Sequence, residues 1–422
     1  MTKTSTKAIT EEKHHNPAYY VRKRFFKNIS AVIGLIMVCF AILIAFLGYL
    51  IMPDNTPNAD DGNPYIKTKP PGFQVTILKR HKNIPLAPQS WFSRFINGTV
   101  SEYSILPVEQ YEINEDDLSV SYSLFGNQKE QMSLVAATQY LYVGDLKQLK
   151  GVEKFGNKKV LIEGKEVSFI NYEGKVEKTT KTRIIEEFKK KNIEKRTYIL
   201  GTDRQGRDML SRLIFGTRIS LGVGLVAILI SVLVGVNLGA LAGFFGGKID
   251  HIITWFMTVV WSIPQIMLVI AISLALGRGI WVAFVAVGLT TWVDIARLVR
   301  GEIMAIKEKQ FIEASRALGL KNFAIVTKHI LPNLFGPLIV IISSSFASAI
   351  LNEAGLSFLG LGAQPPMPSW GMMVSEGTDY IGSEGGFHMI FYPSLAISIM
   401  VLAFNLLGNG LRDAFDPKTM VK

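Results

Sequence analysis

The segment 311–319, which reads FIEASRALG, combines residue types that suit contact with another protein rather than catalysis. Its apolar and small side chains recur at helical spacing, and small residues let a second protein surface approach closely. A glycine at position 319 suits the left-handed residue that ends a helix. We expect contact through an exposed face of this helix and its turn. The residues concerned are Phe311, Glu313, Ala314, Ser315, Ala317, Leu318 and Gly319.

A second helix is expected directly after this one. Asn322 is placed to cap it, and Pro332 marks the entry to the next apolar stretch. The two helices together are too polar to cross a bilayer, so they are expected to lie on its surface.

Patterns that would support catalysis are missing from the sequence. The stretch 243–248 is close to a phosphate-binding loop, but Ala242 stands where a glycine is required and Ile249 where Ser or Thr is required. Glycines at every fourth position are instead typical of close helix packing, and these are Gly235, Gly239, Gly243 and Gly247. The 6 histidines and the single cysteine form no zinc pattern. We expect no catalytic residue, no metal site, no directly bound cofactor and no ATP hydrolysis by this chain.

The elements that position the segment 311–319 follow from the composition. Of the 422 residues, 49% are hydrophobic and only 19% are charged, which excludes a disordered chain or a coiled coil. The apolar residues occur in blocks rather than at regular spacing. The formal charge of +11 would suit nucleic acid as well as the cytoplasmic flanks of membrane spans, so the positions of the charges decide.

Five blocks are long enough to cross a bilayer, and a sixth is a shorter candidate. An apolar core of ~30 Å needs about 20 residues of helix. Five uncharged windows satisfy this requirement, at 28–53, 219–247, 252–277, 329–352 and 387–411. A sixth window, 279–293, is short and spans only if Arg278 and Arg297 reach the two interfaces. If it were re-entrant instead, the termini would lie on opposite faces.

The loop charges fit six spans with both termini in the cytoplasm. The tail 1–27 is rich in lysine and arginine, and the loop 294–332 is also basic, which marks both as cytoplasmic. The loop 353–386 carries no lysine or arginine and belongs outside. The expected protein is all-α and polytopic, in a bacterial cytoplasmic membrane, with residues 54–218 outside.

Between the first two spans lies a region too long for a linker. Residues 54–200 contain short β-rich runs separated by turn signals, at 73–78, 140–143, 159–162, 167–172 and 197–200. We expect a small β-rich or α+β domain inserted there, followed by a core of 201–422. The lysine-rich stretch 183–196 is expected to be a short amphipathic helix.

The segment around 313 resembles the signature of the inner-membrane permeases of binding-protein-dependent ABC importers. That signature contains Glu-Ala-Ala, a later glycine and a final Leu-Pro. The chain has these residues at Glu313, Ala314, Gly319, Leu331 and Pro332, with Ser315 in place of the second alanine and His329 in place of an isoleucine. A histidine at this position resembles the dipeptide and oligopeptide branch of the family.

Three further segments resemble the C-type subunit of that branch. They are GTDRQGRD at 201–208, LSFLGLG with PPMPSWG at 356–371, and NLLGNGLRD at 405–413, with Asn409 where aspartate is usual. The resemblance covers about residues 200–420 and the first span, and it does not cover the inserted region. It implies a type I importer permease fold that moves peptides and binds no cofactor itself.

The resemblance also implies a set of partners and roles. The partners are a second, B-type permease, two ATPase subunits that use ATP and magnesium, an extracytoplasmic substrate-binding protein, a peptide substrate and membrane lipid, and no nucleic acid is expected. The segment 311–319 would dock on an ATPase subunit. The outer loop with Pro365, Pro366 and Trp370 would lie where the binding protein docks.

Other polar residues have both a structural and a functional interpretation. Asn237, Gln265 and Asn405 lie deep in apolar windows, where they could line a translocation path or form hydrogen bonds between helices. Pro264 is expected to kink the third span. Asp203 and Asp208 are expected to pair with Arg207 and Arg212.

Other functions remain open at this level. A nickel or other small-solute importer shares the same permease branch. A membrane-anchored sensor or structural protein would need a larger cytoplasmic domain than the tails supply, and a membrane enzyme would need catalytic clusters.

Overall fold

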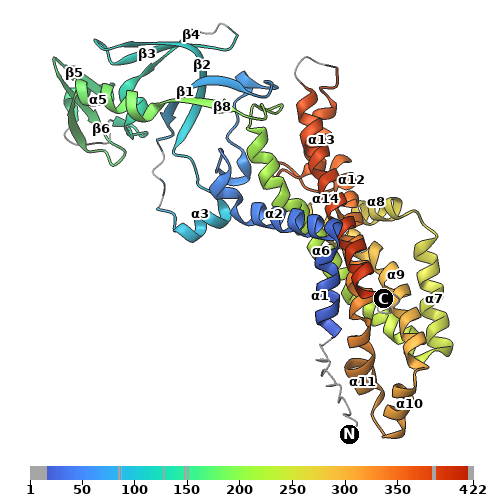
Figure 1. Cartoon of the computed structure of the whole chain (residues 1–422). Helices are drawn as coiled ribbons and strands as arrows, with labels where there is room; N and C mark the ends of the chain where they lie inside the picture. The colour runs from blue at the N-terminus through green and yellow to red at the C-terminus, as the bar shows by residue number, and fades with distance from the viewer. Residues whose placement is uncertain are drawn as a thin grey trace, which may run out of the picture.

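The computed structural model describes residues 17–416 except 84–85, 87, 127–128, 147–148, 150–151 and 383–385. Long helices form a bundle, and a β-containing region projects from one end of it (Figure 1). Five helices in the described part are long and apolar enough to cross a membrane. They are α2 (Ile29–Ile51), α6 (Met209–Phe245), α9 (Ile280–Lys307), α12 (Phe335–Phe358) and α14 (Phe387–Phe415). This arrangement confirms the expected helical polytopic fold with an insertion between its first helices.

A sixth passage is made by a bent pair of helices. α7 (Gly247–Trp261) and α8 (Gln265–Leu276) meet at 91°. The break lies at Pro264, so the expected kink is a complete interruption of the helix. α7 begins beside the end of α6, whereas Gly279, which lies between α8 and α9, donates its N–H to the Leu361 carbonyl just beyond the far end of α12. The pair therefore carries the chain from one end of the bundle to the other.

The window expected to be the weakest span is a regular helix. α9 continues through Lys307, so residues 294–307 belong to this helix rather than to the inner loop, whose start at 294 was placed too early. Two of its arginines contact α7. Arg300 pairs with Asp250 of α7 through Nη2 at 2.7 Å, and Arg297 lies 4.2 Å from the ring centre of Trp261.

Three of the four spaced glycines hold α6 against α9. A Cβ atom on Gly239 would lie 2.5 Å from the Ala296 carbonyl oxygen, and Gly235 and Gly243 meet α9 as closely. The predicted packing face is confirmed for these three. Gly247 is different because it begins α7 with φ +53°.

Both described termini lie at the same end of the bundle as the segment 311–319. Asn28, which caps α2, donates to Asp413 near the end of α14 at 3.2 Å. α1 (Pro17–Lys27) precedes it, and Arg24 donates to the Asp416 carbonyl. α10 (Gln310–Ala317) and α11 (Asn322–Ile325) lie at this end in Figure 1, opposite the inserted region.

Short helical turns complete the helical part. α11 continues through η6 (Val326–Ile330) and η7 (Leu331–Leu334) into α12. α13 (Trp370–Thr378) lies at the opposite end, between α12 and α14. The core between α6, α9, α10 and η6 contains Phe244, Ile303, Ile312 and Ile330.

The inserted region contains two antiparallel sheets. The larger has the order β4-β3-β2-β1-β8 and the smaller β5-β6-β7. The strands are β1 (Phe73–His81), β2 (Tyr103–Asn114), β3 (Ser119–Leu124), β4 (Lys129–Ser133), β5 (Val160–Glu163), β6 (Glu166–Ile170), β7 (Val176–Thr180) and β8 (Ile193–Tyr198). The helical segments are η1 (Pro57–Ala59), η2 (Pro64–Ile66), α3 (Trp91–Asn97), α4 (Leu134–Thr138), η4 (Glu153–Phe155), α5 (Lys181–Glu187) and η5 (Phe188–Asn192). Ile184 and Phe188 pack with Leu78 and Leu134 in its core.

The expected strands are only partly correct. The run 73–78 falls in β1, and the runs 159–162, 167–172 and 197–200 overlap β5, β6 and β8 in part. The run 140–143 forms only a bridge from Leu141 to Asn171. The helix expected over 183–196 ends at Asn192, because Ile193–Tyr198 pairs with β1 as the edge strand β8. Strand pairing there overrides the helical pattern.

Candidate functional site

α10 presents most of the predicted contact residues to the surroundings. Leu318 is 82% exposed and Phe311 is 41% exposed, and Glu313, Ala314 and Ala317 are also exposed. Ile312 is fully buried against α9 and η6, which holds the helix to the bundle. We call the exposed set the α10 surface, made of Phe311, Glu313, Ala314, Ala317, Leu318 and Gly319.

One predicted contact residue points inward. Ser315 is only 7% exposed, and its hydroxyl donates to the Phe311 carbonyl at 2.7 Å. It lies one turn from the buried Ile312, on the face that packs against the bundle. Ser315 therefore does not belong to the contact face predicted from the sequence.

The turn after α10 has the predicted glycine but not the predicted cap. Gly319 has φ +77° and ends the helix as expected. Asn322 is the first residue of α11, and the capping position is held by Lys321, so Asn322 does not cap this helix. Phe323, the second residue of α11, is 79% exposed and was missed, although an aromatic residue shortly after a glycine turn is a signal that the sequence contains.

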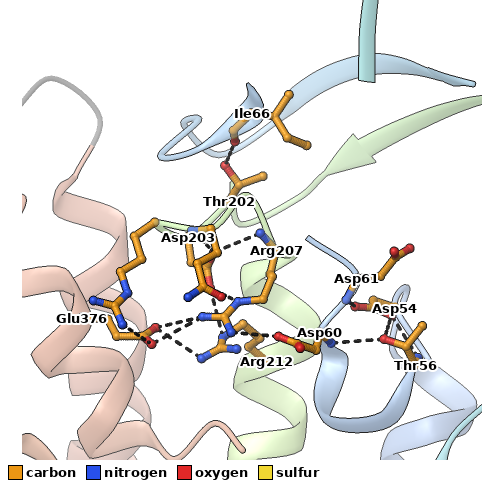
Figure 2. A network of polar contacts seen from close by, with 12 residues as sticks. Asp54, Thr56, Asp60, Asp61, Ile66, Thr202, Asp203, Arg207, Arg212 and Glu376 are labelled. Carbon is orange, nitrogen blue, oxygen red and sulfur yellow. Dashed lines mark hydrogen bonds and ion pairs between the residues drawn. The ribbon is translucent and has the colours of Figure 1, made fainter. Parts of the chain in front are cut away.

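The other end of the bundle contains a buried network of charges (Figure 2). The Arg207 and Arg212 side chains are 2% and 0% exposed. Arg207 Nε donates to Asp203 Oδ2 at 2.6 Å, and its Nη1 donates to Asp60 Oδ1 at 2.9 Å. Both arginines also reach Glu376 of α13 at 3.3 Å. The network thus joins the inserted region, the start of α6 and α13.

The predicted pairing of the GTDRQGRD segment is half correct. Arg207 and Arg212 both lie against Asp203, but Asp208 caps α6 by accepting from the Ser211 N–H at 2.8 Å. Burial raises the pKa of the Asp208 carboxyl, and the Ser211 hydrogen bonds oppose that shift. For Arg207, burial lowers the pKa, but the Asp203 and Glu376 carboxylates outweigh it and leave the pKa raised.

The outer loop contains exposed prolines and a buried tryptophan. Pro365 and Pro366 are exposed and joined by a cis peptide bond. Trp370 is only 2% exposed, and its Nε1 donates to the Leu213 carbonyl at 3.1 Å. Its ring covers Gly216 of α6, where a Cβ atom would be 2.8 Å away. Trp370 is therefore a packing residue, and of the three residues predicted for the docking loop only Pro365 and Pro366 are exposed.

The three polar residues predicted for a path lie apart. Asn237 is exposed on α6 and donates to the Leu233 carbonyl at 2.6 Å, and Asn405 is exposed on α14. Gln265 begins α8 at the helix break and lines a cavity of about 160 Å³ with Thr290 and Asp294. In the part of the chain that the structure describes, no hydrogen bond joins Asn237, Gln265 and Asn405.

Asp294 is a residue whose position the sequence reading missed. The sequence placed it at the start of the inner loop 294–332, but it lies in the middle of α9 and lines the cavity at Gln265. Carboxylates at such a depth are costly and are kept where a function uses them. A helical period continued through 294–307 is the signal that would have placed it. Within the described residues, no group of His, Cys, Asp or Glu is arranged to hold a metal ion.

Comparison with known proteins identifies the family. Residues 235–421 match the model for the binding-protein-dependent transport system inner membrane component, and residues 16–71 match the N-terminal membrane domain of oligopeptide transport permease C. The glutathione transport system permease protein GsiD of Pectobacterium atrosepticum is 44% identical over 220 residues, 52% of this chain and 72% of the relative. The chain belongs to this family of transport permeases.

Other relatives of the permease carry names from the same branch. The dipeptide transport system permease protein DppC of Bacillus subtilis is 44% identical over 218 residues, 52% of this chain and 68% of the relative. The oligopeptide transport system permease protein OppC of Haemophilus influenzae is 40% identical over 221 residues, 52% of this chain and 70% of the relative. Among solved structures, the inward-facing MetNI methionine ABC transporter is 21% identical and has a TM-score of 0.41, covering 48% of the permease and 96% of that chain.

Most of the inserted region lies outside both family matches, because only its first residues, 54–71, fall within one of them. Neither model extends over residues 72–234, which contain both sheets and the buried arginines. The permease therefore combines a family core with an addition at one end.

Proposed function

We propose that this permease is a membrane subunit of an ATP-driven importer that carries peptides across a bacterial cytoplasmic membrane. Relatives named for dipeptide, oligopeptide and glutathione transport support a peptide substrate. The α10 surface is the observation that carries the proposal, because an exposed Leu318 and Phe311 at a helix end need a protein partner.

The α10 surface is proposed to dock on a separate ATPase subunit. Leu318 acts as the apolar anchor, Ala314 and Ala317 permit close approach, and Glu313 orients the helix through polar contacts. The motion of the ATPase subunit on ATP binding moves α10 and, through the buried Ile312, the ends of α9 and η6. The complex contains two ATPase subunits with ATP and magnesium, a second permease and an extracytoplasmic binding protein.

The proposed topology places α10 and both termini in the cytoplasm. The basic helix α1 lies at the end of the bundle that carries α10, and the segment 353–386 without lysine or arginine lies at the other. The inserted region, 54–200, is then extracytoplasmic, and the core is 201–422. Exposed Pro365 and Pro366 offer the binding protein a rigid contact, and Trp370, further along the same loop, is held to α6 by its hydrogen bond to Leu213.

The translocation path is proposed to pass the break between α7 and α8. Gln265 and Asp294 share the cavity at this break, and a carboxylate there can attract the ammonium group of a peptide. Asn237 and Asn405 face outward and are candidates for contact with the second permease. The substitution Asp294→Asn is expected to raise the peptide concentration needed for half-maximal uptake, and unchanged uptake kinetics would exclude Asp294 from the path.

Reconstitution tests the docking assignment. The substitution Leu318→Asp is expected to abolish peptide uptake and co-purification of the ATPase subunits, because it places a charge at the apolar contact. Leu318→Met keeps the apolar volume and serves as the matched control, with uptake retained. Full uptake by Leu318→Asp would remove α10 from the coupling interface.

The choice of substrate needs a separate measurement. Proteoliposomes with all subunits are offered a labelled dipeptide, a longer peptide and nickel ions in parallel. Uptake of nickel without either peptide would assign the permease to small-solute import. Failure of tagged permease to capture any nucleotide-binding subunit would instead favour a sensor or structural protein.

A further inference from the structure

The short helix α3 of the inserted region carries large apolar side chains that the described chain leaves uncovered. Trp91 is 71% exposed and Phe92 is 63% exposed, and Ile96 is exposed one turn further on. Contiguous exposed aromatic residues on a water-facing surface are unfavourable, so this patch calls for an apolar partner. We call Trp91, Phe92 and Ile96 the α3 patch.

Contacts at the other side of α3 fix the helix to the membrane helices. The Phe95 ring lies 4.9 Å from the ring of Phe46 of α2, with the planes at 68°. The Ile96 carbonyl accepts from Arg218 Nη1 of α6 at 2.8 Å. Gly98 ends α3 with φ +78° against the Tyr49 ring. α3 is therefore held by two helices that cross the membrane.

The residues that hold α3 also mark its depth. Arg218 is the last charged residue before the uncharged stretch of α6, and Tyr49 lies in the last turn of α2. Arginine and tyrosine are typical of the boundary between the hydrocarbon core and water. Arg218 lies 5.9 Å from the Tyr49 ring centre, so both residues indicate the same depth of the membrane boundary. α3 lies at this level.

The α3 patch continues the lipid-facing surface of α2. Leu43, Phe46 and Leu50 of that helix are all more than half exposed, as expected for a span that faces lipid. Phe95 covers the edge of this surface, and Figure 1 shows α3 beside α2 below the large sheet. The exposed Arg94 lies between Phe92 and Ile96 and can reach lipid headgroups while the apolar side chains point toward the acyl chains.

We propose that α3 is a membrane-surface anchor whose patch inserts into the bilayer boundary and fixes the inserted region beside the bundle. The partner is lipid, because the patch is continuous with the lipid-facing side of α2 and lies at the depth of Arg218. This inference depends on the membrane spans alone. It is independent of the substrate and of the ATPase partner.

Site-directed spin labelling tests the proposal on the full chain in lipid vesicles. Cys39 is the single cysteine, so a Cys39→Ser background allows one label at a time. A label at Phe92→Cys is expected to collide several-fold more often with oxygen, and several-fold less often with a water-soluble nickel chelate, than a label at Val143→Cys. Val143 is 71% exposed in the same inserted region and is the matched water-facing control. Leu43→Cys on α2 is the lipid-facing reference.

A label at position 92 that meets the nickel chelate as often as position 143 would overturn the proposal. Low collision rates with both reagents would also overturn it, because they would indicate a protein partner over the patch. A second measurement needs no substitution in α3. Unmodified permease in vesicles with a photoactivatable group on the acyl chains is expected to be labelled within residues 91–97, and absence of label there would contradict the anchor.

Discussion

The two ends of the helical bundle differ in which side chains they bury, because one end buries charged residues and the other leaves apolar residues exposed. At the end that joins the inserted region, Arg207, Arg212 and Asp203 are almost fully buried, and their partners come from the same chain. At the other end, the α10 surface leaves Phe311 and Leu318 exposed. We call these the closed end and the open end.

The difference shows which end is structurally complete. Buried charges are tolerated when each is paired, and the closed end achieves this by bringing three elements together around Asp203 and Glu376. Exposed apolar residues on a helix that is itself well packed are typical of a binding surface. The closed end is thus built for rigidity within the chain, and the open end is built for a partner.

The largest effect is expected at the closed end, where a buried arginine is removed. Arg212→Met leaves Asp203 and Glu376 with less compensation, and loss of a partner in a buried ion pair costs about 3 to 5 kcal/mol. Thermal unfolding of the purified permease in detergent measures the loss. Arg204→Met is the matched control, because the Arg204 side chain is 35% exposed and pairs with Glu376 at 3.4 Å. Equal losses in the two variants would mean that the network is not the strong joint of the closed end.

A smaller change in stability with a larger change in function is expected at the open end. Gly319 has φ +77°, and a β-branched residue there costs about 1 to 2 kcal/mol. Gly319→Val is expected to displace the α10 surface and to abolish substrate-stimulated ATP hydrolysis and uptake, with membrane insertion intact. Gly319→Asn tolerates this conformation and should keep activity. Transport by Gly319→Val at the normal rate would show that the open end needs no fixed geometry.

The open end could be predicted from the sequence because its signal is local. The spacing of Phe311, Ala314 and Leu318 and the glycine at 319 define a helix face and its end without reference to other elements. The inward position of Ser315 could not be predicted, because small size alone does not tell which side of a helix packs inward. The buried Ile312 one turn away is the residue that decides it.

The closed end could be predicted only in part because its partners are distant in sequence. Asp60 and Glu376 contact Arg207 although they are 147 and 169 residues away from it in the sequence, and no local pattern predicts such contacts. The burial of Trp370 could not be predicted for the same reason, since its partner Leu213 is far away in the chain. The first part of the edge strand β8 was predicted as helix because residues 193–196 continue the lysine-rich pattern before them, and only pairing with β1 shows that they form a strand.

The smallest effect concerns a buried histidine of the inserted region, at the closed end. His81 is 8% exposed, between the rings of Tyr103 at 4.4 Å and Tyr140 at 4.2 Å. Burial lowers its pKa below the ordinary 6.5, against the raising effect of the Glu102 and Glu187 carboxylates. Because the unfolded chain binds the proton at higher pH, stability is complete above the unfolded pKa and falls, by at most about 1.4 kcal/mol per pH unit, as the pH drops toward the folded pKa.

Calorimetric unfolding across this pH window, compared with His81→Phe, isolates the contribution of the imidazole. Phenylalanine keeps an aromatic ring between the two tyrosines but cannot bind a proton, so the variant should lose part of the acid sensitivity. Identical pH profiles for the two proteins would show that water reaches the imidazole. The exclusion of water at this end would then be confined to the arginine network, where Asp60 contacts Arg207, and would not extend to His81.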